Sequence, residues 1–546
     1  MLRGSRELCA GRARWRRLTA GITMAAVVML ASWATAMTVG GVEAAGEPRV
    51  LTPLLKEAAG QPDRSYRLLV QRGVAGQAAD QAAARLGGKK LTEVKTGPHG
   101  GFVVQLNGRA VEALGRNPAV RWVTVDAPMV ASGTVDTSRL VNVYDGAVSA
   151  TALWSTASTS NVTGKGVGVA ILDTGINSSL DFSGPDGKSR IVASVLFNSS
   201  VRGWKDGHGH GTHVAGIVGG DSNFATNSAG YGKYVGIAPR ANLIDVRVSD
   251  DQGMSYVSDV VNAIDWVIAN RQLYNIRVMN LSLISSVAES YRTSPLAAAV
   301  EKAWFSGVFV VVSSGNLGPN TANYPPANDP FVVAVGAGDP MGTASKVDDG
   351  VAPWSSYGTT QDGYARPDVV APGRYIVSTL AGPQATLAKN YPDRVVDNSY
   401  IRLSGTSMAA PVVAGLAALA FEAHPEWTND QLKWVLQNTA TPLANVPAAA
   451  QGAGEVDAQK VVQYTGTVES ANQGQPISLQ LVGPNGETVY TESTTSTSSS
   501  TSTWSTSSWS TSSWSTSSWS TSSWSTSSWS TSSWSTNGSF QSGAVD

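Results

Sequence analysis

Cysteine is almost absent from this chain, and long apolar runs are rare. The 546 residues include a single cysteine, Cys9, which lies in an N-terminal segment that we expect to be removed. The working protein would then contain neither a disulfide nor a thiol nucleophile, which excludes a disulfide framework and cysteine-based catalysis. Charged residues make up only 14% of the chain, against 42% hydrophobic residues. Stability must therefore come from a packed core, to which bound ions can add.

The one long apolar run lies near the N-terminus and is typical of an export signal. Six arginines within the first 17 residues precede an apolar stretch from about Leu18 to Val39, an order that matches a signal peptide. The stretch is nearly long enough to span a bilayer. Because serine and threonine interrupt it, we expect a cleaved signal peptide at residues 1–44 rather than a retained membrane anchor. This predicts a secreted, extracellular protein, either free or associated with the cell surface.

The length of the chain predicts two or more domains, and its charge is divided unevenly between them. Residues 1–40 carry six arginines and one glutamate, and residues 41–130 carry twelve basic and eight acidic residues. The whole chain has a net charge of −1, so an acidic body follows a basic N-terminal part. Opposite charge favours docking of one part on the other.

Residues 45–130 show the pattern of a small α+β domain, and residues 131–149 are interpreted as a linker or processing region. The predicted strands are Tyr66–Val70, Gly101–Leu106 and Val120–Val125, and the predicted helices are Ala75–Leu86 and Ala110–Gly115.

The pattern over residues 150–465 predicts an α/β domain built on a doubly wound parallel sheet. Apolar runs of strand length alternate with helical periodicity, and their near-continuous hydrophobicity fits strands that are covered on both faces. The expected strands are Val167–Leu172, Leu243–Val248, Val278–Leu283, Val308–Ser313 and Phe331–Val335. Reactive groups in such sheets normally lie at the carboxyl ends of the strands, and Asp173 follows the first of these runs.

The C-terminal part contains a short polar extension and a repeat. In the extension, residues 466–495, we expect Ile477–Val482 and Glu487–Thr491 to pair as a hairpin. Residues 496–546 repeat Ser-Thr-Ser-Ser-Trp with a period of five, which fits neither a helical face nor a strand face. This uncharged repeat cannot bury enough surface to fold alone, so we expect a disordered low-complexity tail. It serves either as an exposed tether or as an attachment to a cell-envelope polymer through its tryptophans.

Three short motifs carry the residue types that hydrolysis needs. Asp-Thr-Gly occupies residues 173–175, His-Gly-Thr-His residues 210–213, and Gly-Thr-Ser-Met-Ala-Ala-Pro residues 405–411. Serine attacks a carbonyl only when a base takes its proton, and a carboxylate can orient that base. Ser407 precedes a helix predicted at Met408–Glu422, so it would lie at a helix N-terminus, where N–H groups favour negative charge. The proline of the third motif would fall in the first turn, where it is tolerated.

In this order, and with Asn316 between the second and the third, the motifs resemble those of the subtilisin-like serine peptidases (subtilases). The resemblance covers about residues 150–462. It implies that Ser407 is the nucleophile, that His210 is the general base, and that Asp173 accepts a hydrogen bond from His210 and stabilises the imidazolium. The side-chain amide of Asn316 and the backbone N–H of Ser407 would form the oxyanion hole.

The resemblance also implies a role for the N-terminal part. Residues 45–130 would be an inhibitory propeptide with a ferredoxin-like fold, which assists folding and occupies the active site as a product-like peptide. It would then be cut away between Asp126 and about Thr151. Substrate would lie as an added strand between segments near 252–254 and 282–286.

Metal binding is an alternative interpretation of the histidines near residue 210 and of several loop carboxylates. His208, His210 and His213 are crowded enough to suggest a metal cluster, but they lack the glutamate of a zinc-peptidase helix. We therefore expect no cofactor to be required for the chemistry. Structural calcium is compatible with scattered loop carboxylates, of which the candidates are Asp181, Asp186, Asp250, Asp251, Asp348 and Asp349.

One departure from the family pattern concerns specificity. Family members usually have Ser-Leu-Gly-Gly where residues 282–285 of this chain are Ser-Leu-Ile-Ser. Ile284 would therefore narrow or reshape the specificity cleft, and Leu317 would make its rim apolar. We expect a preference for uncharged side chains before the scissile bond.

These observations predict a secreted serine endopeptidase that hydrolyses peptide bonds through an acyl-enzyme and is made as a self-processed zymogen. Its partners would be protein or peptide substrates, its own propeptide and, through the tail, an envelope polymer; no nucleic-acid partner is expected. Two alternatives are an adhesive surface protein with an inactive protease fold and a processing enzyme restricted to one cleavage event.

Overall fold

The computed structural model of the protein describes most of the chain after residue 47. The described residues are 48–131, 143–154, 161–184, 186–201, 203–222, 234–483, 488–491 and 501–504. The expected signal peptide at residues 1–44, much of the linker and most of the repeat tail lie outside them. The chain divides into the compact units Met1–Gly46 and Glu47–Asp546, and the description below concerns the second.

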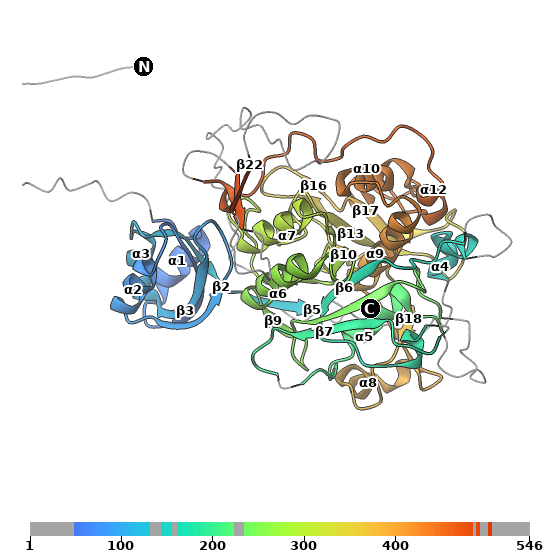
Figure 1. The fold of residues 1–546 in the computed structure, drawn as a ribbon, viewed down its shortest axis with the longest axis horizontal. Helices are drawn as coiled ribbons and strands as arrows, with labels where there is room; N and C mark the ends of the chain where they lie inside the picture. The colour runs from blue at the N-terminus through green and yellow to red at the C-terminus, as the bar shows by residue number, and fades with distance from the viewer. Residues whose placement is uncertain are drawn as a thin grey trace, which may run out of the picture. The chain divides into compact units, whose positions relative to one another are not determined.

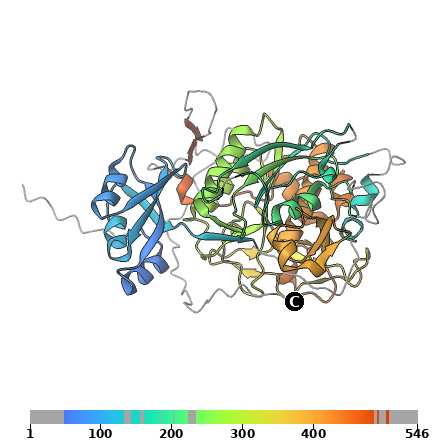
Figure 2. The same ribbon diagram turned by 90° about the horizontal axis from the view of Figure 1, so that it is seen from below.

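Residues 48–126 form a small α+β unit, which we call the N-terminal module. Its antiparallel sheet has the strand order β2-β3-β1-β4, and after α1 the chain runs β-α-β-β-α-β. This confirms the expected ferredoxin-like arrangement, whose helices cover one face of the sheet (Figure 2). The elements are α1 (Thr52–Gly60), β1 (Ser65–Arg72), α2 (Ala78–Arg85), β2 (Lys89–Val94), β3 (Gly101–Asn107), α3 (Gly108–Gly115) and β4 (Val120–Val125).

Side chains on the central strands of the module alternate between two apolar environments. Leu68 and Phe102 pack with the module's own helices in one core cluster. Their neighbours Leu69 and Val103 belong instead to the core cluster of the large domain. Successive side chains of a strand point to opposite faces, so the sheet of the module is apolar on both.

The large domain, residues 143–483, is built on the expected parallel sheet. Its described part contains one eight-stranded sheet with the order β14-β13-β12-β10-β6-β8-β7, and β17 also pairs with β13. All neighbours run parallel except β13 and β14. The strands are β6 (Gly168–Asp173), β7 (Ile191–Leu196), β8 (Asn242–Arg247), β10 (Ile276–Leu281), β12 (Phe309–Ser313), β13 (Val333–Asp339), β14 (Gly350–Val351) and β17 (Val369–Pro372).

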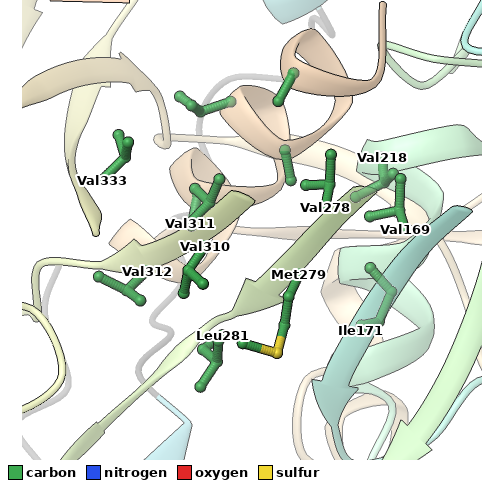
Figure 3. Close-up of a cluster of buried hydrophobic side chains, with 14 of the residues drawn as sticks. Val169, Ile171, Val218, Val278, Met279, Leu281, Val310, Val311, Val312 and Val333 are labelled. Carbon is green, nitrogen blue, oxygen red and sulfur yellow. The ribbon is translucent and has the colours of Figure 1, made fainter. Parts of the chain in front are cut away.

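Helices cover the sheet on both faces, which confirms the doubly wound fold (Figure 1). Helices α6 (Val257–Asn270) and α7 (Pro295–Phe305) pack together, and α5 (His210–Gly219) packs with α9 (Thr406–Ala423). Between these layers, apolar side chains from neighbouring strands meet in one core, and Val218 of α5 lies beside Val169 of β6 (Figure 3). Helix α9 is long and apolar enough to cross a bilayer, but 89% of it is buried inside the protein.

Smaller elements complete the large domain. They are α4 (Tyr144–Ala147), η1 (Ala150–Leu153), η2 (Leu180–Phe182), β15 (Gly358–Thr359), β16 (Ala365–Arg366), β18 (Ile376–Thr379), α8 (Thr386–Asn390), η3 (Pro392–Arg394), β19 (Val395–Val396), β20 (Tyr400–Leu403), α10 (Asn429–Thr439), α11 (Ala448–Gln451) and α12 (Ala458–Val462).

The C-terminal extension differs from the expected hairpin. Leu479–Leu481 form a 3₁₀ turn, η4, and β21 (Thr488–Thr491) pairs with β22 (Thr501–Trp504) instead. The first half of the expected hairpin is held elsewhere, because Ser478 N–H donates to the buried carboxylate of Glu301 at 2.8 and 2.9 Å. Strand β22 is the described part of the tail expected to be disordered, and the rest of that tail lies outside the described residues.

Candidate active site

The sequence-predicted carboxylate and histidine meet at the carboxyl end of β6. Asp173 is the last residue of that strand, and His210 is the first residue of α5. Both oxygens of Asp173 lie near His210 Nδ1, at 2.8 and 2.9 Å. Each side chain is only 2% exposed, so the pair is shielded from water.

This contact determines the state of the imidazole. Burial alone would lower the pKa of His210, but the charge and hydrogen bond of Asp173 more than offset it, and the pKa is raised above its ordinary value. His210 Nε2 has no hydrogen-bond partner among the described residues. It is the ring nitrogen opposite the one that Asp173 holds, and hence the one that can accept a proton.

Ser407 is the second residue of α9, and it is tied to Ser282 just after β10. Its hydroxyl donates to the carbonyl oxygen of Ser282 at 3.1 Å, and the Ser282 hydroxyl donates to the carbonyl oxygen of Ser407 at 2.8 Å. The structure therefore places the Ser407 hydroxyl on Ser282 rather than on His210, and proton transfer requires this hydroxyl to turn.

Helix α9 begins two residues earlier than expected, at Thr406. Pro411 is therefore its sixth residue, and the expectation that it lies in the first turn is wrong. A proline has no N–H to donate to the carbonyl four residues before it, which here is that of Ser407. Ser282 supplies the missing donor, so the buried carbonyl keeps a partner.

Asn316 is oriented by the start of α9. Its side-chain oxygen accepts hydrogen bonds from Thr406 N–H at 3.0 Å and from the Thr406 hydroxyl at 2.9 Å. The amide NH₂ is consequently the end of the side chain that remains available as a donor. An amide fixed in this way beside the N-terminus of α9 is suited to a developing oxyanion.

The two histidines that flank His210, His213 and His208, have separate surroundings. His213 Nε2 lies 3.2 Å from the carbonyl oxygen of Ile376 and 3.0 Å from that of Ile401. Burial lowers the pKa of His213 to about 3, so it is neutral. Burial and then the charge of His210 lower the pKa of His208.

Among the described residues, no group of three or more His, Cys, Asp or Glu side chains is placed to hold a metal. The loop carboxylates considered for calcium include several with partners of their own. Asp251 pairs with Arg247 at 2.5 Å. Asp250 Oδ1 accepts hydrogen bonds from Gln252 N–H at 2.8 Å and Met254 N–H at 2.9 Å.

Asp206 is a functional candidate that the sequence analysis missed. Its buried carboxylate accepts hydrogen bonds from Gly209 N–H at 2.6 Å, from the Thr174 hydroxyl at 2.8 Å, and from both donors of Thr212 at 2.9 and 2.7 Å. It thus joins the segment that follows β6 to the first turn of α5. The only sequence signal is an aspartate four residues before His210 in a glycine-rich loop.

A short strand of the same chain lies between the two segments expected to bind substrate. Strand β5 (Pro128–Ala131) pairs antiparallel with β9 (Met254–Tyr256) on one side and with β11 (Leu283–Ser285) on the other. Ile284 pairs with Val130, and Met254 pairs with the same residue from the opposite side. An extended peptide can therefore bind here by strand addition.

The side chain of Ile284 reaches the loop that carries Asn316. Ile284 is 4% exposed, and a Cβ added at Gly315 would stand 3.0 Å from its Cδ1 atom. Gly315 also has φ +103°, a conformation that favours glycine. Ile284 thus fills space beside Asn316, and Leu317 at 42% exposure makes the adjoining surface apolar.

Comparison with known proteins identifies the family of the chain. Residues 164–455 match the profile of the subtilase family. Serine protease AprX of Bacillus subtilis (strain 168) is 38% identical over 312 residues, which cover 55% of this chain and 67% of the relative. Alkaline elastase YaB of Bacillus sp. (strain YaB) is 33% identical over 349 residues, covering 64% and 76%. Subtilisin E of Bacillus subtilis (strain 168) is 34% identical over 362 residues, covering 66% and 79%.

Proposed function

Because the chain belongs to the subtilase family of serine peptidases, we propose that Asp173, His210 and Ser407 are its catalytic triad and that it is a secreted endopeptidase made as a self-processed zymogen. The observation that carries this proposal is the buried Asp173–His210 contact at 2.8 Å. It lies in a domain whose substrate-binding strands already hold a peptide of the same chain.

In the proposed reaction, the Ser407 hydroxyl turns from Ser282 and gives its proton to His210 Nε2 as its oxygen attacks the peptide carbonyl. Asp173 stabilises the imidazolium that forms. The Asn316 amide and the Ser407 N–H donate to the oxyanion. His210 then protonates the leaving amine, and water hydrolyses the acyl-enzyme by the same route. These steps use only protein groups; calcium, if bound, would add stability without entering them.

The N-terminal module is proposed to be the inhibitor of this site. It leads directly into β5, and its last residue, Asp126, is buried against the start of α6. The Asp126 carboxylate accepts hydrogen bonds from Ser258 N–H at 2.8 Å and from the Ser258 hydroxyl at 2.9 Å, and it pairs with Arg67 at 2.5 Å. We propose that the enzyme cuts its own chain beyond β5, within the processing region expected from the sequence, and that β5 then remains as a bound product.

Secretion and attachment rest on the sequence alone. We propose that residues 1–44 direct export and that the tryptophan repeat of residues 496–546 acts as a tether or binds an envelope polymer. Retention on cell-wall material that disappears when residues 505–546 are deleted would support the second role, and unchanged retention would contradict it.

The test compares the chain lacking residues 1–40 with the same chain carrying Ser407→Ala. We expect the first to shed its N-terminal module and digest casein, and the second to remain intact and inert. If the first chain cuts itself but ignores casein, the enzyme is restricted to a processing event. If neither chain is cut or active, the proposed zymogen and triad are both wrong.

A further inference from the structure

The N-terminal module also contacts the large domain at a place outside the substrate-binding strands. Arg121 lies on β4, and its guanidinium Nη2 donates hydrogen bonds to the carbonyl oxygens of Leu479 and Val482. Both acceptors belong to the C-terminal extension, more than 350 positions later in the sequence. Gly97 meets the same turn, since a Cβ added there would stand 3.6 Å from the carbonyl oxygen of Gln480.

The extension presents these carbonyls from a rigid position. Leu479 N–H donates to the carbonyl oxygen of Arg292, and the Gln480 side chain donates to that of Thr293, each at 2.8 Å. The carboxylate of Glu301 holds Ser478 N–H. Ile477 is fully buried and Leu481 is 3% exposed. The turn is therefore part of the surface of the large domain rather than a loose end.

We propose that the C-terminal extension from Ile477 to Val482 is a second docking site for the N-terminal module, separate from the substrate cleft. This inference rests on the proposed role of the module as an inhibitor. Hydrogen bonds from a charged guanidinium to carbonyls are stronger than neutral ones, and the two that Arg121 donates end on a turn that is fixed beforehand. The extension would thus strengthen inhibition after the chain is cut, when only non-covalent contacts hold the module on the large domain.

The arrangement also has a consequence for biogenesis. The module lies near the beginning of the chain and its second docking site near the end, so full inhibition requires the chain to be complete to about Val482. A chain that ends earlier would carry a weakly inhibited protease.

The experiment measures how fast the module leaves after the chain has been cut. The chain carries Ser407→Ala and a recognition sequence for an unrelated, site-specific protease within residues 132–142, so release is read even if the enzyme never processes itself. Release after dilution is followed by gel filtration. Self-cleavage by the active chain tests the proposed function separately.

Matched variants test whether the contact between Arg121 and the C-terminal extension slows the release of the module. Arg121→Ala should accelerate release about tenfold or more, whereas Arg109→Ala, which removes an exposed arginine paired with Asp63 inside the module, should change it less than twofold. A chain ending at Ser478 should release the module at least as fast as Arg121→Ala, and one ending at Gly486 should match the parent.

Combining Arg121→Ala with the end at Ser478 should add nothing to the effect of the truncation, because the truncation already removes both carbonyl acceptors of Arg121. Additive effects, or release from Arg121→Ala within twofold of the parent, would overturn the proposal. If the chain ending at Ser478 does not fold, amide exchange at residues 479–482 of the uncut chain decides: Arg121→Ala must accelerate it and Arg109→Ala must not.

Discussion

Ser407 and Ser282 exchange two hydrogen bonds, each hydroxyl donating to the other residue's carbonyl oxygen. The exchange is needed because Pro411 cannot donate to the Ser407 carbonyl four residues earlier in α9. Asn280 in turn donates to the Ser282 hydroxyl at 2.9 Å. The proposed nucleophile is therefore positioned by β10 as well as by its own helix.

Ser282→Ala should lower kcat about tenfold with little change in KM. The substitution leaves the buried Ser407 carbonyl without its donor, which costs about 1–3 kcal/mol and loosens the start of α9. Steady-state kinetics and the thermal transition measure the two effects. Ser285→Ala is the control, since its hydroxyl accepts from Val287 N–H at 3.1 Å and does not touch Ser407. Equal losses in both variants would contradict the positioning role.

The acid limb of the pH profile should report His210. The histidine accepts a proton only when neutral, so activity falls as pH drops through its pKa. Asp173 raises that pKa above the ordinary 6.5 in spite of burial. We therefore expect the acid limb of the profile of kcat/KM against pH to have its midpoint above 6.5. Asp173→Asn should lower kcat by about 10⁴-fold. A midpoint below 6 would show that the imidazolium is not stabilised.

Asp206→Asn should reduce kcat/KM about 10- to 100-fold by disturbing the hydrogen bonds that hold Thr174, Gly209 and Thr212. Its charge also contributes to the raised pKa of His210, so the acid limb should move to lower pH. A suitable control is Asp265→Asn, which breaks the buried pair with Lys302 at 2.5 Å between α6 and α7. That variant should lose stability while its pH midpoint stays unchanged.

Ile284→Gly should widen the cleft beside Gly315 and admit larger side chains before the scissile bond. Peptide substrates that differ only at that position, with alanine, phenylalanine or lysine, measure the change. We expect the phenylalanine-to-alanine ratio of kcat/KM to rise about tenfold, in line with the modest energies of pocket contacts. An unchanged ratio would show that Ile284 does not limit the cleft.

Docking of the N-terminal module should weaken as pH rises. Glu289 accepts a hydrogen bond from Thr124 of the module at 2.9 Å, and burial raises the pKa of Glu289 to about 7. Burial, and then the nearby charge of Asp126, also raises the pKa of Asp259 to about 7. Proton uptake therefore accompanies docking if departure of the module returns these groups to water.

The sign follows from linkage. Affinity is highest below the ordinary carboxyl pKa values of 4.5 for glutamate and 3.8 for aspartate. It falls as pH rises to about 7, and is constant above. Release from the cut Ser407→Ala chain should be faster at pH 8 than at pH 5, and Glu289→Gln should reduce the difference. A rate independent of pH would contradict this coupling.

The sequence predicted elements best where one physical signal dominates. The predicted strand Val120–Val125 has the bounds of β4, because a run rich in β-branched and aromatic residues lies between Pro118 and Asp126. Strand β2 was missed since five of its six residues are exposed, and an exposed edge strand leaves no apolar pattern. The extension was misassigned because its turn is set by Glu301 and Arg292, which are distant in sequence.

In the candidate site, too, local motifs could be predicted from the sequence, whereas tertiary contacts could not. Short motifs were sufficient to single out Asp173 and His210, and the structure brings these two together. Asp206 and Ser282 act through tertiary hydrogen bonds, and a lone aspartate or serine carries no signal of that kind in the sequence. The assigned roles of all four residues, Asp173, His210, Ser407 and Asn316, remain predictions.

Covalent labelling with a fluorophosphonate tests the proposed triad most directly. The processed chain should take up one equivalent, which mass spectrometry of its peptides should locate on Ser407. Ser407→Ala should take up none, and His210→Ala should react far more slowly, because the hydroxyl then has no base. Labelling of another residue, or casein digestion by a chain that takes up no label, would contradict the assignment of Ser407 as the nucleophile.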